Sequence, residues 1–248
     1  METIRNATVA GQFYPANEKN LKQQIETCFL EKRGNGSIPS INKNGHPLKG
    51  LIVPHAGFIY SGAIASHSYA RLAEQGFADT FIILGPNHTG MGSGVSVMVD
   101  GAWKTPFGTV HIDSSLAQII ARGIIDIDST AHTYEHSIEV QLPFLQYTAR
   151  GQKFEFVPIC MMMQNYKVVQ EVGATLSDAS RNSNKKIVII ASSDFSHAGF
   201  NYQSMPPPGM RVDRYAEKQD TLAIQKILAL DPEGLISTVE KHNITMCG

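Results

Sequence analysis

The sequence predicts an α/β fold in which a central mixed, largely parallel sheet is flanked by helices on both faces. Two observations predict it. Short apolar runs, rich in β-branched and aromatic residues and bounded by turn residues, are typical of strands that are buried on both faces. Segments with helical spacing of apolar residues alternate with these runs along the chain, which is typical of α/β architecture.

Each predicted element follows from its local pattern. Four continuous apolar runs are too short for ordinary helices and are predicted to be strands: residues 51–54, 80–84, 154–160 and 187–191. Four longer segments carry apolar residues at helical spacing: residues 61–74, 137–147, 167–179 and 214–230. Pro143 is expected to kink the second of these helices. Residues 32–49 and 204–210 are rich in glycine and proline and are predicted to be surface loops.

Composition excludes several classes of protein. The chain of 248 residues is long enough for one large domain, and its formal net charge of −1 argues against nucleic-acid binding driven by charge. No run approaches 18 apolar residues and the N-terminus lacks an apolar signal segment, so we expect no membrane span and no export. The cysteines, Cys28, Cys160 and Cys247, are odd in number and widely spaced. That pattern fits a reducing compartment and a cytoplasmic protein.

Three of the predicted strands run directly into polar loops that carry a histidine. His55 follows the first strand, His88 the second and His197 the fourth, and glycines lie close by. Ligands of α/β sheets bind outside the carboxyl ends of the strands. We therefore expect these three loops to converge on one site.

The residue types at this site suit a metal ion. Neutral imidazole binds zinc, copper, iron and nickel, and a histidine that is not a ligand has a pKa suited to moving protons. Asp194 is three residues before His197 and is expected either to orient it or to hold substrate. Cys247 is a further candidate ligand, although most free cysteines are small buried apolar residues and chain ends tend to fray.

A second pattern, His132-Thr-Tyr-Glu135-His136, matches the H-x-x-E-H signature of a zinc hydrolase. That alternative requires both histidines on one helix, whereas the helix is expected to begin near Glu135. Glu135 and His136 are instead predicted to contact substrate beside the site, or simply to form the acidic first turn of the helix. Tyr60 lies close to His55 in sequence and either presents its hydroxyl to a ligand or packs against the core.

Seven segments in a fixed order resemble the Memo family (AMMECR1–Memo–radical-SAM system protein B), and together they span nearly the whole chain. They are VAGQFYP at 9–15, VPHAGFIYSG at 53–62, ILGPNHTG at 83–90, WKTPFG at 103–108, EHSIEVQLPFLQ at 135–146, SSDFSH at 192–197 and NITMCG at 243–248. The resemblance implies a single Memo-like domain over residues 1–248 whose natural C-terminal strands continue further.

The Memo family is similar in turn to class III extradiol dioxygenases, and this implies a site. His55 and His88 match the two metal-ligand histidines of those enzymes, and Cys247 stands where Memo proteins replace a glutamate ligand by cysteine. Asp194 and His197 match the pair that handles protons or holds substrate. The resemblance implies one iron or copper ion per chain and a redox role. The soft thiolate weakens the expectation of ring cleavage itself.

Two hypotheses therefore stay open at the level of sequence. The first is a mononuclear metal protein with oxidoreductase or dioxygenase-like activity on a small molecule. The second is a module that binds a peptide or small ligand in the same cleft with an eroded metal site. The sequence predicts no particular oligomeric state.

Overall fold

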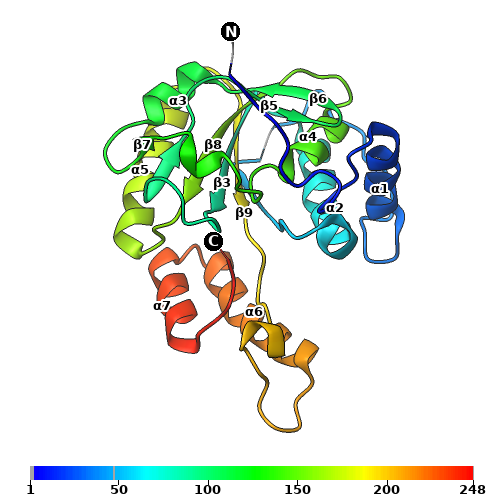
Figure 1. Ribbon diagram of the computed structural model, residues 1–248, viewed down its shortest axis with the longest axis vertical. Helices are drawn as coiled ribbons and strands as arrows, with labels where there is room; N and C mark the ends of the chain where they lie inside the picture. The colour runs from blue at the N-terminus through cyan, green and yellow to red at the C-terminus, as the bar shows by residue number, and fades with distance from the viewer. Residues whose placement is uncertain (1–2, 47, 248) are drawn as a thin grey trace.

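The four predicted strands form the centre of one parallel sheet. In a computed structural model that describes residues 3–46 and 48–247, β2 (Gly50–Val53), β9 (Ile187–Ser192), β3 (Thr80–Pro86) and β8 (Glu155–Met161) are adjacent and parallel (Figure 1). The prediction of a largely parallel sheet is confirmed. The expected domain also includes residues 1, 2, 47 and 248, which lie outside the described part.

Two short strands extend this sheet and make it mixed. β4 (Val95–Val97) pairs antiparallel with β8, and β7 (Asp126–Ile127) pairs parallel with β4. A separate three-stranded sheet contains β1 (Ile4–Arg5), β5 (Ala102–Thr105) and β6 (Gly108–His111). These strands are two to four residues long, and such short runs carry little periodic signal of their own.

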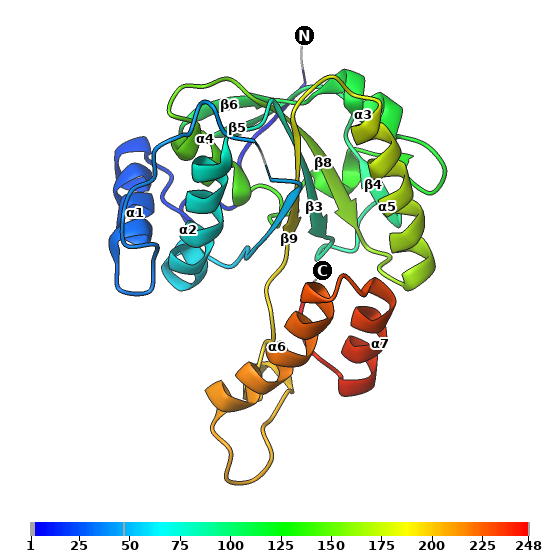
Figure 2. The same cartoon turned by 180° about the vertical axis from the view of Figure 1, so that it is seen from behind.

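Helices cover both faces of the central sheet. The first layer contains α1 (Glu18–Leu30), α2 (Phe58–Gln75) and α4 (Gln141–Ala149), and the opposite layer contains α3 (Ser114–Ile120) and α5 (Tyr166–Arg181) (Figures 1 and 2). α6 (Val212–Leu228) and α7 (Pro232–His242) pack together as a hairpin beyond the carboxyl ends of the strands. The core lies between the layers, and its largest fully buried side chains include Trp103, Tyr69, Phe29, Phe81, Phe144 and Phe156.

The helix boundaries follow local chemistry. The side chains of Asn17, Asp113 and Asn165 accept a backbone N–H in the first turns of α1, α3 and α5, which satisfies donors that the helix itself leaves free. Asp231 caps α7 in the same way, and Pro232 follows at the first helical position.

One predicted helix was wrong at its start. α4 begins at Gln141, and residues 137–140 form turns. Pro143 therefore lies in the first turn, where a missing N–H costs no intrahelical bond, so the expected kink is not needed. Residues 130–132 form a separate 3-10 helix. His132 and His136 thus do not share a helix face, which removes the geometry that the zinc-hydrolase alternative required.

None of the helices within the described ranges is both long and apolar enough to cross a membrane.

Candidate metal centre

The carboxyl ends of β2 and β3 bring two histidines together, as predicted. His55 and His88 follow these strands, and their ring centroids are 5.2 Å apart. β9 lies between β2 and β3 in the sheet, so the loop that begins at Ser193 emerges beside both. The topology of three adjacent parallel strands is therefore what creates the site.

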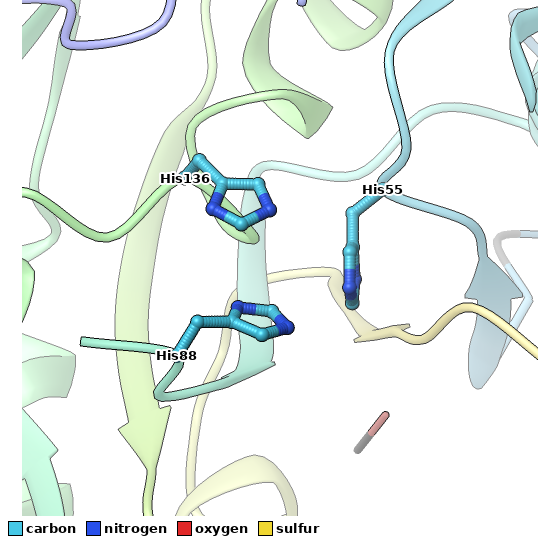
Figure 3. A group of neighbouring side chains, drawn as sticks. All are labelled: His55, His88 and His136. Carbon is cyan, nitrogen blue, oxygen red and sulfur yellow. The ribbon is translucent and has the colours of Figure 1, made fainter. Parts of the chain in front are cut away.

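His136 completes a trio of imidazoles with these two. Its ring centroid lies 4.7 Å from that of His88 and 5.7 Å from that of His55. One ligand nitrogen from each of the three rings lies within 4.8 Å of the other two, and Figure 3 shows the rings gathered around a common space. The third histidine of this trio is His136, whereas the strand pattern pointed to His197.

A second possible ligand group overlaps the first at His55. It contains His55, Asp194 and Cys247, again with ligand atoms within 4.8 Å of one another. The Nε2 atom of His55 lies 3.1 Å from the Cys247 sulfur and 3.8 Å from an Asp194 carboxylate oxygen. His55 is therefore the point that the two groups share.

Backbone contacts hold the segment around Cys247 in place. The Cys247 N–H donates to the Asp194 carbonyl at 3.1 Å, and Asp194 and Cys247 form an antiparallel bridge. Two residues earlier, the Thr245 hydroxyl donates to the His197 carbonyl at 2.6 Å. Chain ends fray unless contacts hold them, and these contacts hold the backbone of Cys247 beside Asp194.

Glu135 is a fully buried carboxylate that orients two rings of the trio. One of its oxygens lies 2.9 Å from Nδ1 of His88 and 3.4 Å from Nδ1 of His136. It also accepts the backbone N–H groups of His136 and Ser137, each at 2.9 Å. Burial alone would raise the pKa of Glu135, but hydrogen bonds from His88 and Ser137 outweigh it and lower the pKa to about 2.

A serine hydroxyl orients the remaining ring. The Ser192 hydroxyl donates its single hydrogen to the Ser137 carbonyl at 2.6 Å and accepts from the Gln141 side-chain amide at 2.8 Å. Nδ1 of His55 lies 3.1 Å from the same oxygen and must therefore be the donor in that contact. The Nε2 atom of His55 is left as a lone pair that faces Cys247.

The protonation states of the two strand-end histidines differ. Burial lowers the pKa of His55 to about 4, so its ring is neutral near pH 7. Hydrogen bonds with Cys247 and with Glu135 raise the pKa of His88 to about 10. In the protein without a metal ion, a proton on His88 therefore balances the buried negative charge, and a cation that binds there must displace it.

His197 lies near the same Asp194 carboxylate as His55. Its Nδ1 atom is 2.8 Å from the Thr245 carbonyl, so that nitrogen is the donor and Nε2 faces the Asp194 carboxylate at 4.0 Å. The other Asp194 oxygen accepts the His55 backbone N–H at 2.7 Å. The Asp194 carboxylate thus lies near the imidazoles of both His55 and His197, while the roles of Asp194 and His197 in handling protons or substrate stay predictions.

Other predicted residues lie in different settings. Tyr60 is 74% exposed on the first turn of α2, and its contact with a ligand stays a prediction, as do substrate contacts of Glu135 and His136. His132 is fully buried, with its ring 5.8 Å from that of Trp103.

Sequence reasoning missed Ser192 and Gln141, which hold His55, and Phe13, whose ring packs 4.6 Å from that of His136. Each lies inside a segment that resembled the Memo family. Position in that pattern was the only signal, because no spacing rule assigns them a role.

Fold and site together define a class: an α/β protein that gathers imidazoles, a carboxylate and a thiol at the carboxyl edge of a parallel sheet, a donor set suited to a transition-metal ion. A family model described as Memo-like protein matches residues 5–248, and the chain belongs to the Memo family.

Relatives named MEMO1 family protein align over nearly the full chain. The one from Methanopyrus kandleri is 46% identical over 246 residues, covering 98% of this chain and 82% of its own length. The one from Sulfolobus acidocaldarius is 46% identical over 250 residues, covering 99% and 84%. The one from Methanocaldococcus jannaschii is 44% identical over 255 residues, covering 100% and 84%.

Proposed function

We propose that this Memo-family protein binds one iron or copper ion through His55, His88 and Cys247 and uses it in oxidoreductase, dioxygenase-like chemistry. The observation that carries the proposal is that His55 and His88, which follow the strands on either side of β9, converge while Nε2 of His55 lies 3.1 Å from the Cys247 sulfur. Each of these ligands is held by the rest of the fold.

The donor chemistry fits such an ion. Imidazole suits iron and copper, and thiolate favours soft or redox-active ions over magnesium or calcium. Ligand histidines in metal sites donate their other ring nitrogen to a carboxylate, carbonyl or similar acceptor. His88 does so to Glu135 and His55 to Ser192. These contacts of the two rings support the proposal.

The bound ion would supply Lewis acidity and one-electron chemistry, and the chain's own residues would handle protons. One carboxylate oxygen of Asp194 lies 3.8 Å from Nε2 of His55 and 4.0 Å from Nε2 of His197. His197 is 29% exposed in its side chain, so it can exchange protons with solvent. We propose that His197 moves protons to or from a small-molecule substrate and that Asp194 holds its ring in register.

Anaerobic titration with Fe(II) and with Cu(I), read by elemental analysis, tests the proposal. We expect about one ion per chain in the native protein. We expect its loss in the double variant His55→Ala/His88→Ala and a weakened site in Cys247→Ser. His67→Ala is the matched control, because His67 lies on α2 and bonds the Arg33 carbonyl outside the site.

Metal content that is absent from the native protein, or unchanged in the double variant, contradicts the proposal. In that case a ligand screen in EDTA tests whether the cleft binds a peptide or small anion without metal.

A further inference from the structure

We propose that His136 is a third imidazole ligand, so that the centre contains two overlapping donor sets that select different metal ions. The three-imidazole set, His55, His88 and His136, holds a borderline ion such as Co²⁺ or Zn²⁺ without Cys247. The second set, in which the Cys247 thiolate binds together with His55, holds Cu⁺. This inference rests on the proposed metal-binding function and assigns ligands within that site.

The geometry of the trio is that of a ligand group. The candidate nitrogens lie within 4.8 Å of one another, and the rings of His88 and His136 are stacked, with planes inclined by 23°. In Figure 3 these two rings each direct a nitrogen toward His55. For one ion to bind all three, these nitrogens would move closer together until each lies at the ligand distance of about 2.0–2.1 Å.

All three rings have an acceptor on the side away from the common space. Glu135 faces Nδ1 of both His88 and His136, and the Ser192 hydroxyl faces Nδ1 of His55. Nδ1 of His88 and Nδ1 of His55 lie within hydrogen-bond distance of these acceptors, and a donating Nδ1 leaves Nε2 as the atom offered to a metal ion. Nδ1 of His136 lies 3.4 Å from the Glu135 carboxylate, whose negative charge favours a hydrogen on that nitrogen as well. A histidine that served only as packing would need no such arrangement.

His136 is also held in place before any ion binds. Phe13 packs against one part of its ring, with centroids 4.6 Å apart, and His88 stacks on it. The side chains of His136 and His88 are 20% and 35% exposed, whereas that of His55 is 2% exposed. An ion can therefore enter from the side of His88 and His136 and meet an ordered donor.

The two sets differ in chemical softness. Three neutral imidazoles suit zinc, cobalt and iron(II), whereas a thiolate favours Cu⁺. Since His55 belongs to both sets, one ion at a time occupies the centre. Removing Cys247 should then cost mainly Cu⁺ binding, and removing His136 should cost mainly Co²⁺ binding.

Competition titrations with Co²⁺ and, anaerobically, with Cu⁺ test this on the full chain. Cys247→Ser should keep one Co²⁺ per chain. Its affinity for Cu⁺ should fall by at least about tenfold, because removing even a hydrogen-bond partner of a metal ligand lowers metal affinity by that much. His136→Gln should lose Co²⁺ binding while it keeps most of its affinity for Cu⁺. The combined variant Cys247→Ser/His136→Gln should bind neither ion.

Two additions keep the result interpretable. His136→Phe preserves an aromatic ring between Phe13 and His88 without a donor nitrogen, and it replaces His136→Gln if thermal melting shows that the latter misfolds. In Co²⁺-loaded Cys247→Ser, pulsed paramagnetic resonance should detect three imidazole nitrogens.

The inference is overturned if Cys247→Ser loses Co²⁺ together with Cu⁺, or if loss of His136 leaves Co²⁺ binding unchanged. If the native protein binds neither ion, the proposed metal-binding function fails as well. The native protein therefore distinguishes failure of the proposed function from failure of this inference alone.

Discussion

The Glu135 carboxylate lies 2.9 Å from Nδ1 of His88, and both side chains belong to segments that are far apart in sequence. The contact fixes the ring of His88 so that its other nitrogen faces the centre. It also places a buried negative charge where a cation would bind, which favours an ion over a neutral ligand.

Glu135→Gln should weaken metal binding while leaving all proposed ligands in place. Glutamine is uncharged, and the NH₂ group that replaces one carboxylate oxygen cannot accept a hydrogen bond from His88. We therefore expect metal affinity to fall by about 10–100-fold. Competition titration against a chromophoric chelator measures it. Glu74→Gln is the control, since Glu74 pairs with Arg71 on the exposed face of α2. Equal affinity in native and Glu135→Gln protein contradicts the assigned role.

Ser192→Ala should loosen His55 in the same way from the other side. Loss of the hydroxyl removes the acceptor for Nδ1 of His55 and a partner of Gln141. We expect metal affinity to fall by about tenfold. Ser196→Ala is a matched control in the loop that follows β9, because the Ser196 hydroxyl is buried without a hydrogen-bond partner in the described part of the chain. If both variants lose metal affinity to a similar extent, the loss reflects a general disturbance of this segment, and the role assigned to the Ser192 hydroxyl is contradicted.

Acid should destabilise the protein through His132. Burial, aided by the positive charge of Arg5, lowers its pKa to about 4, against about 6.5 in an unfolded chain. Between these values the unfolded state binds a proton that the folded state does not, so the stabilisation present above pH 6.5 falls as the pH drops toward 4. The part due to His132 reaches roughly 3 kcal/mol.

Urea unfolding from pH 7 to pH 4.5 measures this effect. His132→Phe should show a shallower loss of stability with falling pH than the native protein, whatever its stability at pH 7. Part of the native slope should persist in the variant, because burial also lowers the pKa of His55 to about 4. Identical slopes would show that His132 is not the group that titrates.

Glu139 should contribute more to stability than any exposed ion pair. Its carboxylate lies 2.7 Å from the Arg5 guanidinium, accepts the Tyr14 hydroxyl at 2.6 Å, and is almost fully buried. Glu139→Gln leaves the Arg5 charge buried and unpaired, at a cost of about 3–5 kcal/mol.

Glu217→Gln on α6 is the comparison for that variant. Glu217 pairs with Arg214 at an exposed position, where water and salt screen the charges, so its loss should cost far less stability than the loss of Glu139. Urea denaturation midpoints of both variants measure the difference, and similar midpoints would contradict it.

The central architecture follows from local patterns in the sequence. The apolar runs at 51–54, 80–84, 154–160 and 187–191 form the four adjacent parallel strands. β3 and β8, at the centre, are buried along almost their whole length, which is where continuous β-branched and aromatic residues are stable. The position of His55 and His88 directly after two of these strands was enough to place both at one edge of the sheet.

The residues that complete the site depend on tertiary packing. His136 and Glu135 precede α4, and Ser192 and Gln141 act through hydrogen bonds between segments more than 50 residues apart in sequence. No local pattern records such contacts, because they depend on how the α4 segment packs against the sheet. The same packing placed His136 beside His55 and His88, while Thr245 turned His197 toward Asp194.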